Sequence, residues 1–324
     1  MTTLRSLITT PFTAADTTDD VLRGVDLRGV RVVVTGASSG LGKETARALA
    51  LSGAEVTMAV RNESAGLAAV DELTRAGAQA PPRVALLDLA DRSSVARFVD
   101  EWEGTLHLLV NNAGVITRGL ERNRDGLELQ FATNHLGHFA LATGLRRALA
   151  AGASERGGAR IVSLSSTAHM RAGIDFEDLQ FERRRYDPQI AYAQAKTANS
   201  LLSVEATRRW ASDGIVANTV NPGGVATGLQ RNFSPRQKAS LDAAEAAGVF
   251  AYKTVEQGAA TTIVAAVRPE FAHTGGHYLD DAQEAYMVPD DATLADHPHG
   301  VKEWALDPEA AERLWKVSRR LVFD

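Results

Sequence analysis

Residues 31–52 read RVVVTGASSGLGKETARALALS, and this stretch decides the fold. The β-branched run Arg31–Thr35 predicts a buried strand, and the Ala- and Leu-rich run Leu41–Ser52 predicts a helix. Glycines in the spacing Gly-x-x-x-Gly-x-Gly join the two, and glycine allows a tight turn that lets an anion approach the backbone. The helix N-terminus adds free N–H groups and the positive end of the helix dipole. A strand, a glycine turn and a helix in this order predict nucleotide binding; a plain glycine-rich turn is the alternative.

The same alternation continues along the chain. Further strands are expected at Val56–Val60, Arg83–Leu87, Leu106–Val110, Arg160–Leu164, Ile215–Val220 and His277–Leu279. Further helices are expected at Asp19–Gly24, Ser64–Ala76, Ser93–Trp102, Gly126–Ala150, around Tyr192 and Lys196, and at Ser234–Ala247, Val255–Arg268 and Pro308–Val322. Near-continuous apolar strands that alternate with helices indicate a parallel sheet covered on both faces. We therefore predict a doubly wound α/β fold with a parallel sheet of about seven strands.

No internal repeat or Pro/Gly/Ser-rich linker divides the chain. We expect one domain over residues 29–324, with an N-terminal arm at residues 1–28 and a C-terminal helical extension. In doubly wound sheets the ligand lies at the carboxyl ends of the strands. The irregular segments at about residues 167–190 and 228–250 are therefore expected to form substrate lids.

Composition excludes several classes of protein. The net charge of −5 and the pI of 5.9 leave no electrostatic footprint for nucleic acid. The absence of cysteine excludes disulfides and thiolate metal sites. No apolar run approaches the roughly 18–20 residues that span a bilayer, and the N-terminal stretch lacks the pattern of a signal peptide. We expect a cytoplasmic protein without a metal, and we interpret His297-Pro-His299 as a solvated loop because no third ligand is apparent nearby.

The segment Tyr192-Ala-Gln-Ala-Lys196 places a phenol and an ammonium one helical turn apart. A neighbouring cation favours the phenolate and lowers the pKa of a tyrosine. We therefore predict that Lys196 lowers the pKa of Tyr192, so that the phenol can exchange a proton near neutral pH. The spacing alone is a weak signal, because any amphipathic helix can carry it.

The end of the second expected strand reads Val60-Arg61-Asn62 and has no acidic residue. An acid at this place contacts the 2′-hydroxyl of NAD, whereas an arginine accommodates the 2′-phosphate of NADP. Arg61 could pair with that phosphate through two hydrogen bonds. We predict that NADP(H) is preferred, with NAD(H) possible; the alternative is a solvated arginine at a strand end.

Taken together, the motifs resemble those of the short-chain dehydrogenase/reductase family, over about residues 27–229. Thr35–Gly42 is similar to its glycine motif, Asn111–Gly114 to its fourth-strand motif and Asn221–Thr227 to the motif after its sixth strand. The runs Thr133–His138 and Lys196–Asn199 are similar to the retinol-dehydrogenase-like and protochlorophyllide-reductase-like branches, in which a long insertion before the catalytic tyrosine also occurs. The resemblance implies a Rossmann-type domain.

The resemblance also implies the site. The catalytic set would be Asn134, Ser166, Tyr192 and Lys196, with Ser165 as a lesser candidate for the serine. Tyr192 would be the general acid or base, Lys196 would lower its pKa and bind the nicotinamide ribose, Ser166 would hold the substrate oxygen, and Asn134 would support a proton-relaying water. The cofactor-binding set would be Thr35, Gly36, Ser38, Ser39, Gly40, Leu41, Gly42, Arg61, Asp88, Leu89, Asn112, Ala113, Gly114, Tyr192, Lys196, Pro222, Gly223, Val225 and Thr227.

The function implied is hydride transfer between nicotinamide and an alcohol, ketone or aldehyde. Apolar residues in the second lid segment suggest a bulky hydrophobic substrate: Leu229, Phe233, Val249 and Phe250. One alternative is a nucleotide sensor without turnover, which would not need the four catalytic residues together. A sugar epimerase or dehydratase is a weaker alternative, because those relatives usually have a different glycine spacing. The small side chains of Ala193, Ala195 and Ala198 suit close helix contacts, and in the family this helix often forms a dimer interface, so a homodimer is possible.

Overall fold

The computed structural model describes residues 6–228, 239, 242–243, 245–246 and 251–324. The expected helix Ser234–Ala247 and the expected lid at 228–250 fall almost wholly outside the described residues, as do the four apolar residues that suggested a hydrophobic substrate. The strands and helices around the glycine motif lie within them.

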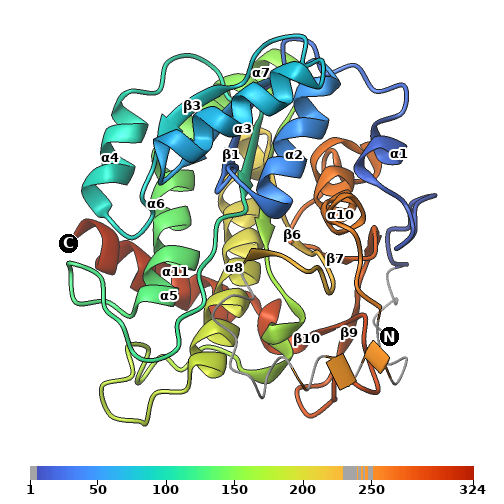
Figure 1. Cartoon of the computed structure of the whole chain (residues 1–324). Helices are drawn as coiled ribbons and strands as arrows, with labels where there is room; N and C mark the ends of the chain where they lie inside the picture. Colours follow the sequence, from blue (N-terminus) through green and yellow to red (C-terminus); the bar gives the residue numbers. More distant parts are fainter. Residues whose placement is uncertain (1–5, 229–238, 240–241, 244, 247–250) are drawn as a thin grey trace.

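An eight-stranded sheet forms the centre of the molecule (Figure 1), in the order β3-β2-β1-β4-β5-β6-β7-β8. Its strands are β1 (Arg31–Thr35), β2 (Glu55–Val60), β3 (Arg83–Leu86), β4 (Leu108–Asn111), β5 (Ala159–Leu164), β6 (Ile215–Asn221), β7 (Tyr278–Asp280) and β8 (Gln283–Glu284). The first seven strands in this order are parallel. The strand order reverses between β1 and β4, which leaves a crevice at the carboxyl ends of these two strands.

The sheet differs from the prediction at its last strand. β8 is antiparallel to β7 and follows it through Asp281 and Ala282, whose φ angles of 46° and 65° are unusual for residues other than glycine. A second, two-stranded parallel sheet pairs β9 (Tyr286–Val288) with β10 (Gly300–Lys302). Neither feature was predicted, because a strand of two or three residues carries too little pattern to be recognised.

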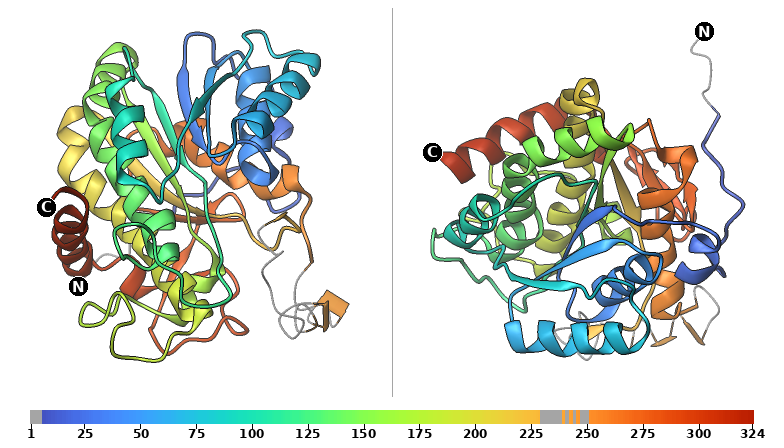
Figure 2. Two further views of the ribbon diagram at one scale, coloured as in Figure 1. Left: turned by 60° about the vertical axis from the view of Figure 1, so that its left-hand side comes forward. Right: turned by 90° about the horizontal axis from the view of Figure 1, so that it is seen from above.

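Helices cover both faces of the large sheet (Figures 1 and 2). One face carries α1 (Thr18–Leu22), α2 (Gly40–Leu51), α3 (Glu63–Arg75) and α10 (Val255–Val267). The other face carries α4 (Arg92–Asp100), α6 (Gly137–Gly144), α7 (Arg146–Arg156), α8 (Pro188–Trp210) and α11 (Pro308–Phe323). Among the described residues, no helix combines the length and the hydropathy that crossing a membrane requires.

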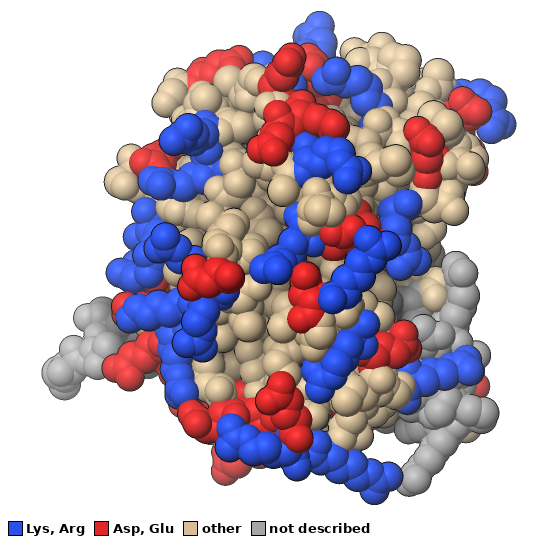
Figure 3. All heavy atoms as spheres, turned by 90° about the vertical axis from the view of Figure 1, so that its left-hand side faces the viewer, with Lys and Arg blue, Asp and Glu red and all other residues tan. Residues whose placement is uncertain are grey.

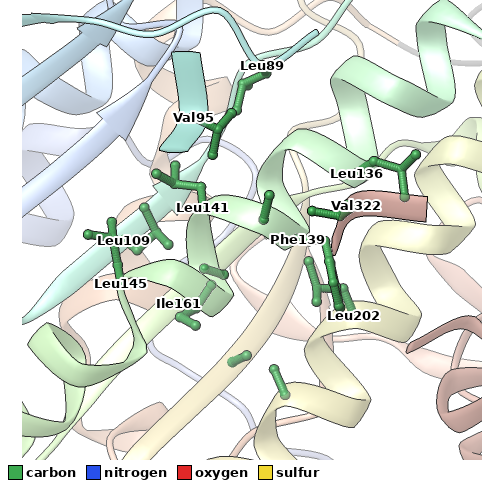
Figure 4. Packing of buried hydrophobic residues seen from close by; sticks show 14 of the residues in the cluster. Leu89, Val95, Leu109, Leu136, Phe139, Leu141, Leu145, Ile161, Leu202 and Val322 are labelled. Carbon is green, nitrogen blue, oxygen red and sulfur yellow. The ribbon is translucent and has the colours of Figure 1, made fainter. Parts of the chain in front are cut away.

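The core beneath the second face joins segments far apart in the sequence (Figure 4). Leu109 of β4 and Ile161 of β5 meet Leu141 of α6, and Phe139 of α6 lies near Leu202 of α8. All are less than a tenth exposed, so this cluster is dry and holds the helices that carry the candidate catalytic residues against the sheet.

The long helix expected at Gly126–Ala150 is wrong as a single element. The chain forms a short α5 (Leu129–Phe131), a π-helical turn η1 (Ala132–Leu136) and then α6, and α7 begins only after Leu145. A π turn holds one residue more than an α turn, so it leaves the apolar pattern of the sequence almost unchanged. The wider turn contains Asn134, which makes it a feature of the candidate site.

The C-terminal helix α11 packs along α8 (Figure 2). The Trp315 ring lies edge-on to Phe139 at 4.9 Å and to Trp210 at 5.3 Å. The face with α4 and α11 mixes acidic and basic side chains (Figure 3). Because α11 packs along α8, it covers part of the helix for which the family resemblance suggests a dimer contact.

The N-terminal arm runs beside β8. The Ile8 carbonyl accepts a hydrogen bond from Glu284 N at 3.1 Å, and Ile8 N donates to the Glu284 carboxylate at 2.8 Å. Thr10 N donates to the Gln283 side-chain carbonyl at 2.8 Å. The arm then enters α1, whose N-cap is Thr17. These contacts tie the arm to the last strand of the sheet.

Candidate active site

The glycine turn after β1 is shaped to receive a dinucleotide. Gly36 and Gly40 have φ angles of 65° and 53°, which favour glycine. A Cβ at Gly36 would lie 3.0 Å from Ala113 Cα, and one at Gly42 would lie 2.6 Å from the Gly36 carbonyl oxygen. Ser39 is the N-cap of α2, but its side chain makes no capping hydrogen bond. The N–H groups of the first helical turn therefore receive no cap from Ser39. An anion such as a diphosphate fits these donors.

A cleft of about 440 Å³ opens at this turn. Seventeen of the predicted cofactor-binding residues line it, namely Thr35, Gly36, Ser38, Ser39, Gly40, Leu41, Gly42, Arg61, Asp88, Leu89, Asn112, Ala113, Gly114, Tyr192, Lys196, Pro222 and Thr227. The phosphate end and the Tyr192–Lys196 end thus belong to one continuous space.

Two predicted cofactor residues do not line the cleft. Val225 pairs with Lys253 and packs against Gly258, where a Cβ would lie too close to its methyl group. At Gly223 a Cβ would meet the Lys253 side chain at 3.1 Å. Lys253 packs against the loop after β6 at both positions. Gly223 and Val225 therefore contribute to the position of this loop and do not line the cleft.

Sequence reasoning missed other lining residues. They are Ala59, Asn62, Leu87, Val115, Ile116, Thr133, Leu164 and Gly228, and Ser165, the lesser candidate for the catalytic serine, lines the cleft as well. Most stand next to a predicted residue at a strand end, so the position after each strand was the available signal. Their apolar or neutral character gave no chemical signal of its own.

Thr35 and His138 connect three segments behind the cleft. The Thr35 hydroxyl accepts hydrogen bonds from Asn112 N at 2.9 Å and Ala113 N at 3.0 Å, and it lies 2.9 Å from His138 Nε2. His138 Nδ1 lies 2.9 Å from the Asn134 carbonyl oxygen, which can only accept, so Nδ1 carries the proton. Burial lowers the pKa of His138 to about 4, which keeps the ring neutral. Nε2 then accepts from the Thr35 hydroxyl, so the Thr35 hydroxyl and the His138 Nδ1–H group each have an acceptor.

Asn134 is fully buried, and its side chain is committed to the loop after β4. Its amide oxygen accepts from Val115 N at 2.7 Å, and its amide nitrogen donates to the Val115 carbonyl at 3.0 Å. A Cβ at Gly114 would lie 3.5 Å from Asn134 Oδ1 and 3.7 Å from Lys196 Nζ. Asn134 Oδ1 and Lys196 Nζ thus both lie close to Gly114, which has no side chain to fill the space beside them.

Lys196 is buried, and Nζ donates to the Leu164 carbonyl at 2.9 Å. This is the single acceptor found for its three N–H groups among the described residues. The same carbonyl accepts from Asn199 Nδ2 at 2.9 Å. Burial lowers the pKa of Lys196 to about 8, so the side chain is mostly charged at neutral pH and has donors left for a ligand.

The predicted acidification of Tyr192 is wrong for the geometry of this structure. A hydrogen bond with Ser166 lowers the pKa of Tyr192, but burial outweighs it and raises the pKa above the usual value for tyrosine. Lys196 Nζ lies 5.5 Å from the centroid of the Tyr192 ring and is bonded to Leu164, so the cation faces the ring instead of the hydroxyl. Tyr192 is therefore protonated at neutral pH, with Ser166 beside its hydroxyl.

His299, expected in a solvated loop, lies in an exposed turn and is also tied to the end of β7. Its Nδ1 lies 2.8 Å from Asp280 Oδ2, and the other Asp280 oxygen accepts from Asn221 Nδ2 at 3.1 Å. Lys253 pairs with the adjacent Asp281, and the Asp280 carboxylate raises the pKa of His299. The two carboxylates are thus neutralised by side chains of the protein itself, in a network that supports the loop after β6.

The buried ammonium predicts a pH-dependent stability. Because its folded-state pKa, about 8, lies below the unfolded value of about 10.4, the unfolded chain binds more protons between these values, and stability rises with pH across that window. We expect wild type to gain up to about 3 kcal/mol relative to Lys196→Met between pH 7 and pH 10. Urea unfolding of both proteins at the two pH values measures this. A constant difference between them would contradict a lowered pKa of Lys196.

Comparison with known proteins identifies the family. A family model described as short chain dehydrogenase matches residues 31–238, so the chain belongs to the short-chain dehydrogenase/reductase family. It is an oxidoreductase that acts on CH–OH or C=O groups with NAD(P). A protein named probable oxidoreductase from Streptomyces antibioticus is 48% identical over 299 residues, which cover 90% of this chain and 97% of that protein.

Two further relatives agree. Retinol dehydrogenase 12 of Mus musculus is 34% identical over 311 residues, which cover 92% of this chain and 88% of that protein, and this supports the branch expected from the sequence. The crystal structure of an uncharacterised protein from Mycobacterium Paratuberculosis matches with a TM-score of 0.70 at 32% identity, over 97% of this chain and 98% of the other.

Proposed function

We propose that this enzyme transfers hydride between NADP(H) and the carbonyl or alcohol group of a hydrophobic small molecule, with Tyr192 as the general acid or base. The observation that carries the proposal is that Tyr192 and Lys196 line one end of the glycine-lined cleft, with Ser166 hydrogen-bonded to Tyr192. A non-catalytic sensor has no need for this arrangement, and the family is one of oxidoreductases. Consumption of NADPH over a panel of ketones and aldehydes tests the proposal, and no turnover of any member would overturn it.

The residues that would hold the cofactor follow from the cleft. The glycine turn and the N-terminus of α2 would bind the diphosphate, Arg61 the 2′-phosphate, Asp88 and Leu89 the adenine, and Lys196 the nicotinamide ribose. The bound cofactor supplies the hydride donor or acceptor.

The protein supplies the proton. Since Tyr192 is protonated at neutral pH, its hydroxyl can donate to a carbonyl oxygen that lies beside it, and Ser166 can donate a second hydrogen bond to the same oxygen. The ammonium of Lys196 lies over the Tyr192 ring, and its remaining donors would bind the nicotinamide ribose. We propose reduction as the physiological direction, which the proposed use of NADP(H) supports.

A hydrophobic substrate is supported by the segment after β4. Val115, which is bonded to Asn134, and the buried Ile116 both line the cleft, and Gly114 lies between Asn134 and Lys196. Apolar side chains therefore stand close to the reacting end. We propose a fairly bulky apolar alcohol or carbonyl compound, and the panel should show a kcat/KM that rises with the apolar surface of the substrate.

We also propose a cytoplasmic location, for which the cysteine-free sequence is the support. A homodimer is a further expectation from the family resemblance. Sedimentation of the purified protein across a range of concentrations tests it.

Arg61 offers a direct test of cofactor preference. It is exposed at the end of β2 and lines the cleft, where a 2′-phosphate would pair with it. Hydrogen bonds to charged groups contribute about 1.5–3 kcal/mol, so Arg61→Asp is expected to weaken NADPH binding by roughly tenfold to a hundredfold, with little loss for NADH. Fluorescence titration of both cofactors measures the two dissociation constants.

A matched control is Arg75→Asp, an exposed arginine in the last turn of α3, roughly 20 Å along the helix from the cleft. This variant makes the same change of charge and should bind both cofactors like the wild type. Equal or tighter binding of NADH by the unaltered protein would contradict the preference for NADP(H).

A further inference from the structure

Tyr278, at the start of β7, lies directly behind the Ser165–Ser166 turn. It is 2% exposed and contributes no surface to the cleft among the described lining residues. Its hydroxyl forms a hydrogen bond with the Ser165 side chain and lies 3.1 Å from His169 Nδ1. The Tyr278 and His169 rings are 4.7 Å apart. Neither residue belongs to a motif recognised in the sequence, yet the two side chains meet beside the candidate catalytic serine.

Two contacts fix the tautomer of His169. Lys302 N donates to Nε2 at 3.3 Å, so Nε2 is the acceptor, and Nδ1 lies 2.8 Å from the Ser166 carbonyl oxygen, so Nδ1 carries the proton. Burial lowers the pKa of His169 to about 4 and keeps the ring neutral. The Nδ1–H group is shared between the Ser166 carbonyl and the Tyr278 oxygen. His169 is therefore a fixed donor to the backbone of Ser166.

The remaining hydroxyl groups can then point in one direction only. Ser165 Oγ donates to the Lys196 carbonyl at 2.9 Å, so its oxygen is left to accept from the Tyr278 hydroxyl. A chain of hydrogen bonds runs from His169 through Tyr278 and Ser165 to the backbone of Lys196. Its two ends are the main-chain oxygens of Ser166 and Lys196, the residues on either side of Tyr192.

The C-terminal segment holds this chain from outside. Trp304 Nε1 donates to the His169 carbonyl at 3.1 Å, and the Lys302 backbone N–H holds Nε2 of the ring. Lys302 is itself 1% exposed, and its ammonium donates to the Pro289 carbonyl at 3.0 Å and the Asp290 carbonyl at 2.8 Å. The β9–β10 segment thus holds His169, and His169 in turn donates to the backbone of Ser166.

We propose that Tyr278 and His169 are positioning residues for the reaction, and that they hold Ser166 and the Lys196 turn of α8 at the distance Tyr192 requires. This inference rests on the proposed function of Tyr192. Neither side chain would touch the substrate or the cofactor; both would act through the position of the serine hydroxyl. A shift of the order of 1 Å at a reacting group can cost about a hundredfold in rate, so a hydroxyl that sets this position should be visible in kcat.

Tyr278→Phe tests the role of the phenol, because it removes one oxygen and keeps the ring. We expect kcat to fall by about tenfold or more, while the NADPH dissociation constant and the melting temperature stay close to those of wild type. Tyr286→Phe, at an exposed tyrosine of β9, is the matched control and should leave kcat unchanged. Wild-type kcat in Tyr278→Phe would overturn the inference.

A pair of substitutions tests His169. Asparagine places an N–H group near the Nδ1 position, whereas glutamine places its amide near Nε2. His169→Asn should therefore retain most of kcat, and His169→Gln should lose it at least tenfold, with both variants folded by circular dichroism. Equal kcat in the two variants would mean that His169 serves packing alone.

A spectroscopic measurement reads the same geometry without turnover. In cofactor-free protein labelled with ¹⁵N-histidine, the resonances lost in His169→Asn should show a neutral ring with the proton on Nδ1 at pH 7. A proton on Nε2 would overturn the hydrogen-bond chain. The two proposals fail differently: a wild-type protein that turns over no carbonyl compound overturns the proposed function and this inference together, whereas turnover that depends on Tyr192 but is indifferent to Tyr278 overturns this inference alone.

Discussion

Tyr192→Phe is expected to lower turnover by about 10²–10⁴-fold, the range that a positioned proton donor contributes. The substitution removes the hydroxyl that is hydrogen-bonded to Ser166 at the Tyr192–Lys196 end of the cleft. Ser166 and Lys196 stay in place, because their hydrogen bonds to Ala168 N and to the Leu164 carbonyl do not involve Tyr192. The NADPH dissociation constant should therefore change little.

The measurement is kcat on whichever carbonyl compound of the panel turns over fastest, together with NADPH binding by fluorescence. Tyr286→Phe again serves as the control, since it makes the same change at an exposed position. Turnover within about threefold of wild type would show that the proton comes from another group, and the catalytic assignment would then be lost.

Gly42→Ala is expected to lower the affinity for NADPH strongly. The added Cβ would lie 2.6 Å from the Gly36 carbonyl oxygen and would also clash with the Asn112 side-chain nitrogen, so the glycine turn must move away from α2. Overpacking of this kind typically costs about 1–3 kcal/mol, and here the displaced atoms are those that would face the diphosphate. We expect NADPH affinity to fall by on the order of a hundredfold.

Gly119→Ala is the matched control. A Cβ at Gly119 would meet nothing within 4 Å, and its φ angle is not in the left-handed region. This variant should bind NADPH like wild type, and circular dichroism should show both variants folded. Wild-type affinity in Gly42→Ala would mean that the dinucleotide does not lie against this turn.

The sequence was most informative where one residue type is physically required. Short, largely apolar runs predicted the seven parallel strands within a few residues, and the glycine spacing marked the cleft. Both signals are local, because a buried strand and a tight turn each restrict the residues that can form them.

Properties that depend on surroundings were not predictable. The direction of the pKa shift of Tyr192 was wrong because spacing along a helix does not show where the Lys196 ammonium points or how deeply the phenol is buried. The π turn at Ala132–Leu136 and the tie between His299 and Asp280 are likewise products of tertiary contacts. His169 follows Ser166 closely in the chain, but Tyr278 stands far from the family motifs, so only the fold reveals that the two side chains meet beside Ser165 and Ser166.

The arm at the start of the chain has a consequence for how copies of this protein meet. A sheet that ends in an unpaired strand offers its N–H and C=O groups to a strand from any neighbouring molecule, which is a common route to aggregation. Here the Ile8 carbonyl oxygen accepts a hydrogen bond from Glu284 N, and the Thr10 hydroxyl donates one to the Ala282 carbonyl oxygen. The N-terminal arm thereby covers the sheet edge at β8. A second molecule would have to displace the arm before it could add a strand there.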